Sequence, residues 1–360
     1  MLAAAALMFA ACAQFDTVNE VPESEPQAIG FDTYAQMTTR AENSNASTTN
    51  ALSTHHLSFE VWAYKNTATN YVFGTNTNEG VAVTYADSKW GYTGTKYWDK
   101  AASQYEFYAA APVGQEWVLN ANTDSQADDY FTLANFALTG TTLPNSTSLT
   151  SSFSTVGDID LMIASAEPVT SIPPTDNIVQ LDFNHILSRL NISVKKGANI
   201  AAGDPLVLTG ISVNNLVKNG SFEESAAVQA GTTQRWSAAS TPADYDITGN
   251  TLDPVTTTAT YVFQALVIPQ RANAEDLKRD GSDVNETTSE PYLTLSYTIA
   301  GEPYSATFNL SKAFAPAPAT YYDFFEGYQH TLNITIDASA ILFQADAFVW
   351  DAKNAGHPID

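Results

Sequence analysis

The sequence predicts an all-β protein with two antiparallel β-sandwiches in series. Apolar and polar residues alternate with a period of two along most of the chain, which is typical of half-buried strands. Glycine, asparagine, aspartate and threonine recur between these segments at short spacing, and no stretch has the pattern of a convincing amphipathic helix. With 360 residues, 44% of them hydrophobic, the chain can form two domains of ordinary size, each with its own core.

The N-terminal segment predicts export as a lipoprotein. Cys12 is the one cysteine of the chain and follows a short apolar run. This run is shorter than the roughly 20 residues that span a bilayer, so residues 1–11 are interpreted as a signal peptide. Small residues before a lone cysteine are what a lipoprotein signal peptidase recognises, and we expect Cys12 to be acylated. The alternative is a short buried segment with an inert cysteine.

Residues 12–40 are expected to form a propeptide. Its first part is an acidic spacer rich in proline and glutamate, which lacks the apolar content needed to pack. One isolated strand follows, and Ile29, Phe31 and Tyr34 are its candidate core residues.

A candidate processing site ends the propeptide. Arg40 is the only lysine or arginine among the first 64 residues, and the polar tract that begins at Ala41 has no apolar pattern. A basic residue beside such a tract is an easy target for a trypsin-like protease, which would cut between Arg40 and Ala41. A solvated linker arginine is an equally good interpretation.

The first sandwich is expected over residues 41–175. Pro173 and Pro174 mark its end, because proline cannot donate to a sheet ladder. Its expected strands each place apolar residues on one face: Leu57, Phe59, Val61 and Ala63; Tyr71 and Phe73; Val81, Val83 and Tyr85; Ile159, Leu161 and Ile163.

The second sandwich is expected over residues 176–360. The inward residues stand at odd positions from Val179 to His185 and at even positions from Leu190 to Val194. We therefore expect a bulge or break in the strand near residues 187–189. A hairpin is expected from Leu293 through residues 300–303 to Leu310. The other expected strands carry these apolar residues: Tyr261, Phe263, Ala265 and Val267; Leu332, Ile334 and Ile336; Ile341 and Phe343; Phe348 and Trp350.

The charge balance excludes one class of partner. With 39 acidic and 15 basic residues, the chain has a formal charge of −24, which repels nucleic acids. It also disfavours adsorption to anionic lipid.

Catalytic and metal-binding patterns are absent from the sequence. None of the five histidines has a zinc-binding spacing, and there is no nucleophile elbow or phosphate-binding loop. Residues 280–286 resemble a calcium loop in composition only, because they lack its central glycine. His185 is expected to be a hydrogen-bonded core residue. We therefore expect no enzyme activity, no cofactor and no metal.

The aromatic residues between Trp90 and Tyr108 leave a second function open. Alternation at Tyr105 and Phe107 favours core packing, but exposed rings could also stack on sugars. Trp90, Trp98 and Trp117 are the candidates for such a glycan platform.

Several segments together resemble the fimbrillin family of Bacteroidales, the pilins and pilin-like lipoproteins of type V pili. They occur in the order typical of that family: 96–99 with 105–112, 160–164, 179–190, 268–270, and 326–336 followed by 341–343 and Trp350. A tyrosine is usual in the family where His330 stands. The resemblance covers nearly the whole chain.

The resemblance implies a structural and assembly function. It implies two transthyretin-like sandwiches, lipidation at Cys12, and cleavage after Arg40 that frees the first strand and leaves a groove. Ile29, Phe31 and Tyr34 would plug this groove before processing. A neighbour's C-terminal strand would fill that groove, with Ile341, Phe343, Phe348 and Trp350 as candidate donor residues. The implied partners are other copies or other fimbrial subunits, a trypsin-like protease and a surface glycan or protein, and the implied location is the outer membrane and the fimbrium. A glycan-binding surface lipoprotein is the competing hypothesis.

Overall fold

The computed structural model is nearly all β, as the sequence predicts. It describes residues 25–35, 58–75, 79–87, 89–121, 129–138, 160–166, 168–224, 235–238, 247–273, 290–315 and 319–349. Cys12, Arg40, Ala41, Trp350 and the segment 280–286 lie outside these residues. The one α-helix of the described part is the short α2 (Leu310–Phe314).

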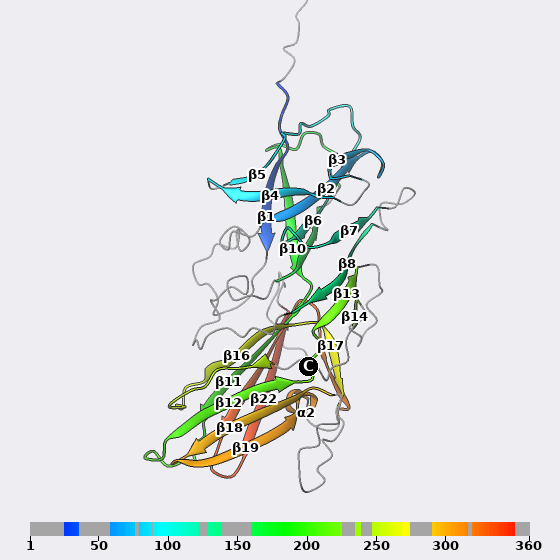
Figure 1. Cartoon of the computed structure of the whole chain (residues 1–360). Helices are drawn as coiled ribbons and strands as arrows, with labels where there is room; N and C mark the ends of the chain where they lie inside the picture. The colour runs from blue at the N-terminus through cyan, green and yellow to red at the C-terminus, as the bar shows by residue number, and fades with distance from the viewer. Residues whose placement is uncertain are drawn as a thin grey trace, which may run out of the picture.

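The first sheet occupies one half of an elongated molecule (Figure 1). Its strands follow the order β1-β10-β9-β6-β2-β4-β5, and β3 also pairs with β2. Their bounds are β1 (Gly30–Ala35), β2 (Phe59–Lys65), β3 (Tyr71–Phe73), β4 (Val81–Ala86), β5 (Lys89–Tyr92), β6 (Tyr105–Ala111), β9 (Met162–Ser165) and β10 (Ile178–His185). The pairing of β1 with β10 is parallel, so the sheet is mixed rather than purely antiparallel.

A smaller sheet joins segments from both sides of the expected domain boundary. β7 (Trp117–Asn120) and β8 (Tyr130–Ala137) pair with β13 (Asn219–Glu223) and β14 (Trp236–Ala238) in the order β14-β13-β8-β7. In addition, β10 follows residue 175 but belongs to the first sheet. The expected division between residues 175 and 176 therefore does not coincide with a boundary between sheets, because strand pairing here links distant parts of the chain.

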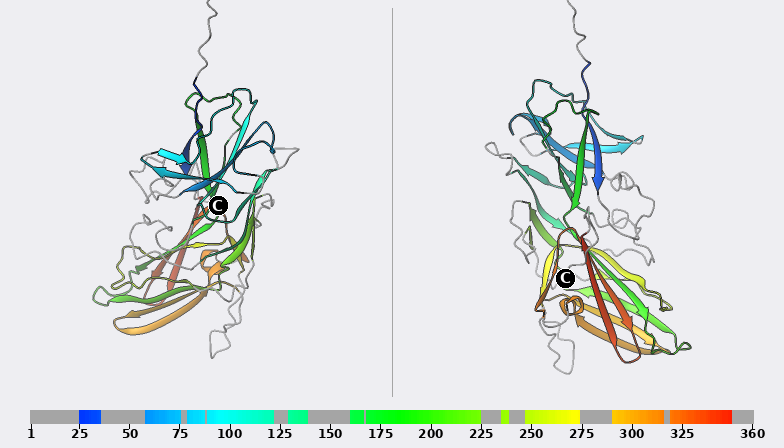
Figure 2. Two further views of the ribbon diagram at one scale, coloured as in Figure 1. Left: turned by 45° about the horizontal axis from the view of Figure 1, so that its top comes forward. Right: turned by 180° about the vertical axis from the view of Figure 1, so that it is seen from behind.

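Two four-stranded sheets form the other half of the molecule (Figure 2). One has the order β16-β11-β21-β22, with β11 and β21 parallel, and the other has the order β15-β12-β18-β19. β17 and β20 pair separately. The bounds are β11 (Ser188–Lys196), β12 (Leu206–Asn214), β15 (Ile247–Thr248), β16 (Thr260–Val267), β17 (Gln270–Asn273), β18 (Tyr292–Ile299), β19 (Glu302–Asn309), β20 (Tyr321–Phe324), β21 (Tyr328–Ile336) and β22 (Ile341–Val349).

The predicted hairpin and the predicted break are confirmed. β18 and β19 are joined through Ala300 and Gly301, both with positive φ, which suits a tight two-residue turn between antiparallel strands. The strand pattern stops at β10 and restarts at β11, on either side of residues 186–187. Leu310 was expected to continue the second hairpin strand but begins α2 instead, because the Asn309 side chain caps the helix by accepting from the Lys312 N–H at 3.1 Å.

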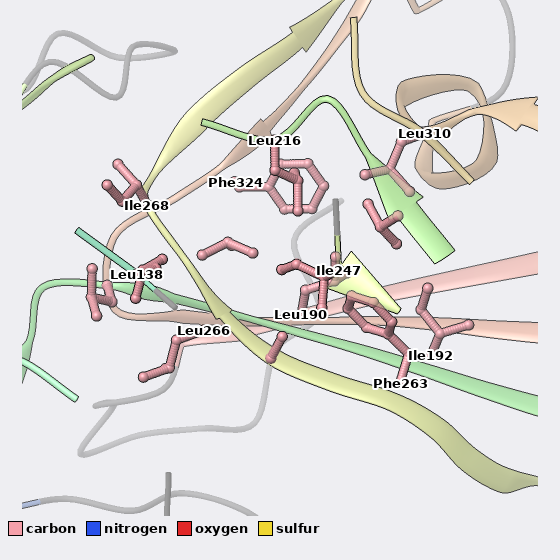
Figure 3. Packing of buried hydrophobic residues seen from close by; sticks show 14 of the residues in the cluster. Leu138, Leu190, Ile192, Leu216, Ile247, Phe263, Leu266, Ile268, Leu310 and Phe324 are labelled. Carbon is pink, nitrogen blue, oxygen red and sulfur yellow. The ribbon is translucent and has the colours of Figure 1, made fainter. Parts of the chain in front are cut away.

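The break divides the apolar residues between two cores. Residues 179, 181 and 183 pack in the core of the first sheet, whereas Leu190, Ile192 and Val194 pack between the sheets of the second half. Figure 3 shows Leu190 and Ile192 beside Phe263 and Ile247 in this second core. The change of parity therefore has a physical reason, since consecutive strands serve different cores.

Candidate functional site

β1 is one edge strand of the first sheet, and the residues just before it contact the segment that follows β5, the other edge strand. Its residues from Gly30 to Ala35 lie opposite residues 178–183 of β10 in a parallel register. The residues just before it pair with the segment that follows β5: the Ile29 N–H donates to the Lys96 carbonyl at 2.9 Å, and the Trp98 N–H donates to the Gln27 carbonyl at 3.0 Å. One short segment therefore links both ends of the sheet.

Phe31 is the central contact of this segment. Its ring lies edge-on or steeply tilted against four other rings, with centroid distances of 5.3 to 6.2 Å. These rings, which we name the β1 seat, are Phe59, Phe73, Tyr92 and Phe107. Ile29 is only 2% exposed and Phe31 only 6%, and the Tyr92 hydroxyl donates to the Ile29 carbonyl at 2.8 Å. Two of the predicted first-strand residues are thus buried in the first core.

Thr33, rather than Tyr34, is the third residue of the inward row. Its side chain is 1% exposed, and its Oγ1 is a buried oxygen with no hydrogen-bond partner among the described residues. Tyr34 lies opposite Asp182 in the backbone register. The sequence prediction named Tyr34 because it is aromatic, although the parity of Ile29 and Phe31 points to residue 33.

β22 is an edge strand of the other half and contains three of the four candidate donor residues, Ile341, Phe343 and Phe348. It pairs with β21 over nine positions, from Ile336↔Ile341 to Tyr328↔Val349. Ile341 and Phe343 are half-buried, and the Phe343 ring packs edge-on against Phe308 of β19 at 4.8 Å. Leu342, on the opposite face, is 57% exposed. Phe348 lies opposite Gln329 in the register, and Trp350 lies outside the described residues.

His330 lies on β21 directly beside β22 and is fully buried. Desolvation lowers the pKa of His330 to about 3, so the ring is neutral. The Phe325 N–H donates to Nε2 at 3.2 Å, which places the ring proton on Nδ1, 2.8 Å from the Tyr322 hydroxyl. This histidine is therefore a structural residue of the sheet that holds β22.

The glycan platform is not formed by the predicted tryptophans. Trp90, Trp98 and Trp117 are 9%, 6% and 3% exposed, because their rings pack into the two cores. A buried ring cannot stack on a sugar. His185 is also a core residue, as predicted, with Nδ1 2.8 Å from Asp160 Oδ2.

Metal clusters and membrane-spanning helices are absent from the residues that the structure describes. These residues contain no group of three or more His, Cys, Asp or Glu side chains placed to hold a metal ion. They also contain no helix with the length and hydropathy needed to cross a membrane.

Comparisons with known proteins agree on one family. A family described as fimbrillin-like matches residues 39–349. Fimbrium subunit Fim1C of Phocaeicola vulgatus is 24% identical over 235 residues, which cover 59% of this chain and 55% of that protein; the chain thus spans about half the length of this curated relative.

One solved structure supports the fold, and a second is less similar to this chain. A fimbrial protein from Bacteroides vulgatus has 17% identity and a TM-score of 0.51, with 90% of this chain and 99% of that chain covered. The tip fimbrial protein Mfa3 from Porphyromonas gingivalis, truncated at its C-terminus, has 10% identity and a TM-score of 0.42, with 89% and 98% covered.

Proposed function

Because this chain belongs to the fimbrillin-like family, we propose that it is a structural or adhesive subunit of a type V fimbria on the bacterial surface. The observation that best supports an assembly function is the seating of β1, which links both edges of the first sheet. Removal of residues 27–35 would expose backbone donors and acceptors on β10 and on residues 96–98, together with the apolar β1 seat. Exposed edges of this kind bind extended segments of other chains.

The precursor would reach the surface as a lipoprotein. In this proposal Cys12 is acylated, and residues 12–40 remain attached until a trypsin-like protease cuts between Arg40 and Ala41. Before the cut, β1 is tethered to its own sheet and returns to it at a high effective concentration. After the cut, only its noncovalent contacts hold it, so processing makes β1 replaceable. A surface glycan or protein stays a predicted additional partner.

The replacing strand would come from another molecule. β1 and β22 lie in opposite halves of the elongated molecule (Figures 1 and 2), so β22 of the same copy does not lie near the β1 seat. A strand donated from one copy to the next makes a head-to-tail contact, which does not close on itself and therefore builds filaments.

Limited trypsin treatment of the full chain tests this proposal. We expect one cut at Arg40, release of the propeptide and ladders of oligomers on native gels, whereas the Arg40→Ala protein stays monomeric. Lys100→Ala serves as a matched control, because it removes a basic residue elsewhere in the same half. Ladders of equal strength from the Arg40→Ala protein would remove processing from the proposed mechanism.

A further inference from the structure

β1 and β22 have the same apolar pattern. Ile29, just before β1, forms an inward row with Phe31 and Thr33 of β1. β22 carries Ile341, Phe343 and Ala345 at the same spacing. These three β22 residues also pack toward their own core, so each of the two rows faces the hydrophobic core of its own half of the molecule. The shared form is an isoleucine, a phenylalanine and a small residue at alternate positions.

We propose, on the basis of the assembly function above, that Ile341, Phe343 and Ala345 of a second copy replace Ile29, Phe31 and Thr33 in that register, and that the buried Thr33 hydroxyl makes β1 the weaker occupant. The incoming strand runs parallel to β10, as β1 does. Phe343 then enters the β1 seat.

Differences in burial favour this exchange at the first two positions. Ile341 and Phe343 are half-buried where β22 lies on the edge of its own sheet, whereas the positions of Ile29 and Phe31 are almost fully buried. Transfer from a half-buried to a buried position removes further apolar surface from water. In addition, β22 has one strand partner, β21, whereas the β1 segment has partners on both sides.

The third position makes the difference between the two occupants. Thr33 places a hydroxyl group in a buried site where no described group accepts or donates a hydrogen bond. A buried hydroxyl without a partner is unfavourable, because it loses its hydrogen bonds to water. Ala345 has no polar side-chain atom, so it fills this position without that penalty.

The outward positions also accept the proposed register. Leu342 would take the place of Gly30, where an added Cβ would meet only the Asn177 carbonyl oxygen and Ile178 Cγ1, both at 3.5 Å. This is ordinary van der Waals contact. Leu342 and Ile178, which are 57% and 41% exposed in the single chain, would cover each other.

Substitutions at the third position test the inference in the full chain after trypsin treatment. Thr33→Val keeps the shape and removes the hydroxyl, so the cleaved propeptide should stay bound about tenfold longer, with assembly slowed by a similar factor. Ala345→Thr should slow assembly while leaving propeptide release unchanged. Thr298→Val and Ala202→Thr are matched controls, because both positions lie outside β1 and β22.

The two measurements separate this inference from the proposed function. Propeptide retention is followed by gel filtration and mass spectrometry, and assembly by native gels. If the cleaved wild-type chain forms no ladders, the assembly function itself is wrong. If ladders form but Thr33→Val releases its propeptide as fast as the wild type, the role of Thr33 is wrong.

Cross-linking tests the register directly. Two proteins are prepared in a Cys12→Ser background, one with Gln344→Cys and the other with Gln180→Cys. A cross-link between positions 344 and 180 then always joins two molecules. Position 344 takes the place of Asp32, which lies opposite Gln180, and we expect this pair to cross-link in the ladders. The control partner carries Asp182→Cys instead, at a position two residues away from the one that the proposed register places opposite position 344. Preferential cross-linking to position 182 would overturn the proposed register.

Discussion

β1 and β22 are both edge strands, but they are held by different forces. β22 has a nine-position ladder with β21 and half-buried side chains. The segment that comprises β1 and the residues just before it has a six-position ladder with β10, hydrogen bonds to residues 96–98, and three side chains that are at least 94% buried. Since backbone hydrogen bonds largely exchange with water, burial decides how firmly a strand is held. The longer ladder therefore does not make β22 the more firmly held strand.

Truncation of equivalent phenylalanines gives the largest expected contrast. Phe31→Ala should lower the free energy of unfolding by about 3–5 kcal/mol, because it leaves a cavity among four rings. Phe343→Ala should lower it by about half as much, since this ring is half-buried. Urea unfolding of the uncleaved proteins, monitored by tryptophan fluorescence, measures both. Equal losses would contradict the difference between the two strands.

Acidification should weaken the half of the molecule that contains β22. The pKa of His330 is about 3 in the folded protein and about 6.5 when unfolded, so below pH 6.5 the unfolded chain binds a proton that the folded chain does not. The stability contribution is therefore present above pH 6.5 and is lost toward pH 3. Between pH 7 and pH 5 we expect a loss of about 2 kcal/mol from this residue.

The His330→Gln protein isolates this effect. It keeps an acceptor for the Phe325 N–H but has no ionisable group, so its stability should fall less steeply between pH 7 and pH 5. Urea midpoints for both proteins across this range give the comparison. Parallel pH profiles would show that His330 does not titrate on unfolding.

A polar contact on the outer face of β22 should give a smaller effect. The Asn333 amide donates to Asp346 at 3.2 Å, and the Ser193 hydroxyl donates to Asn333 at 2.6 Å. Asp346→Ala should weaken the attachment of β22 by about 1 kcal/mol, whereas Asp346→Asn keeps an acceptor and should change it less. Hydrogen exchange of the β22 amides measures this. Gln344→Ala, at an exposed position, should stay within about 0.5 kcal/mol of the wild type.

Parts of the site could be predicted from residues close together in the sequence. Ile29 and Phe31 were identified by alternation, and the break after β10 by a change of parity. Thr33 was missed because a threonine on an inward row looks polar, and its lack of a partner depends on atoms from other strands. Alternation also favoured core packing for the aromatic residues that include Trp90 and Trp98, which are buried. Only the structure shows that these rings and Trp117 form no glycan platform, since exposure of a ring depends on what packs over it.

The sequence by itself determined that the chain is all β, that Ile29 and Phe31 face inward while the third inward residue was missed, and which family the chain resembles. Only the tertiary structure decided which strands are neighbours: β1 beside β10, β8 beside β13, and β22 at an edge. The reason is physical. Alternation is a property of consecutive residues in one strand, whereas pairing is chosen by the side chains that distant strands bury together.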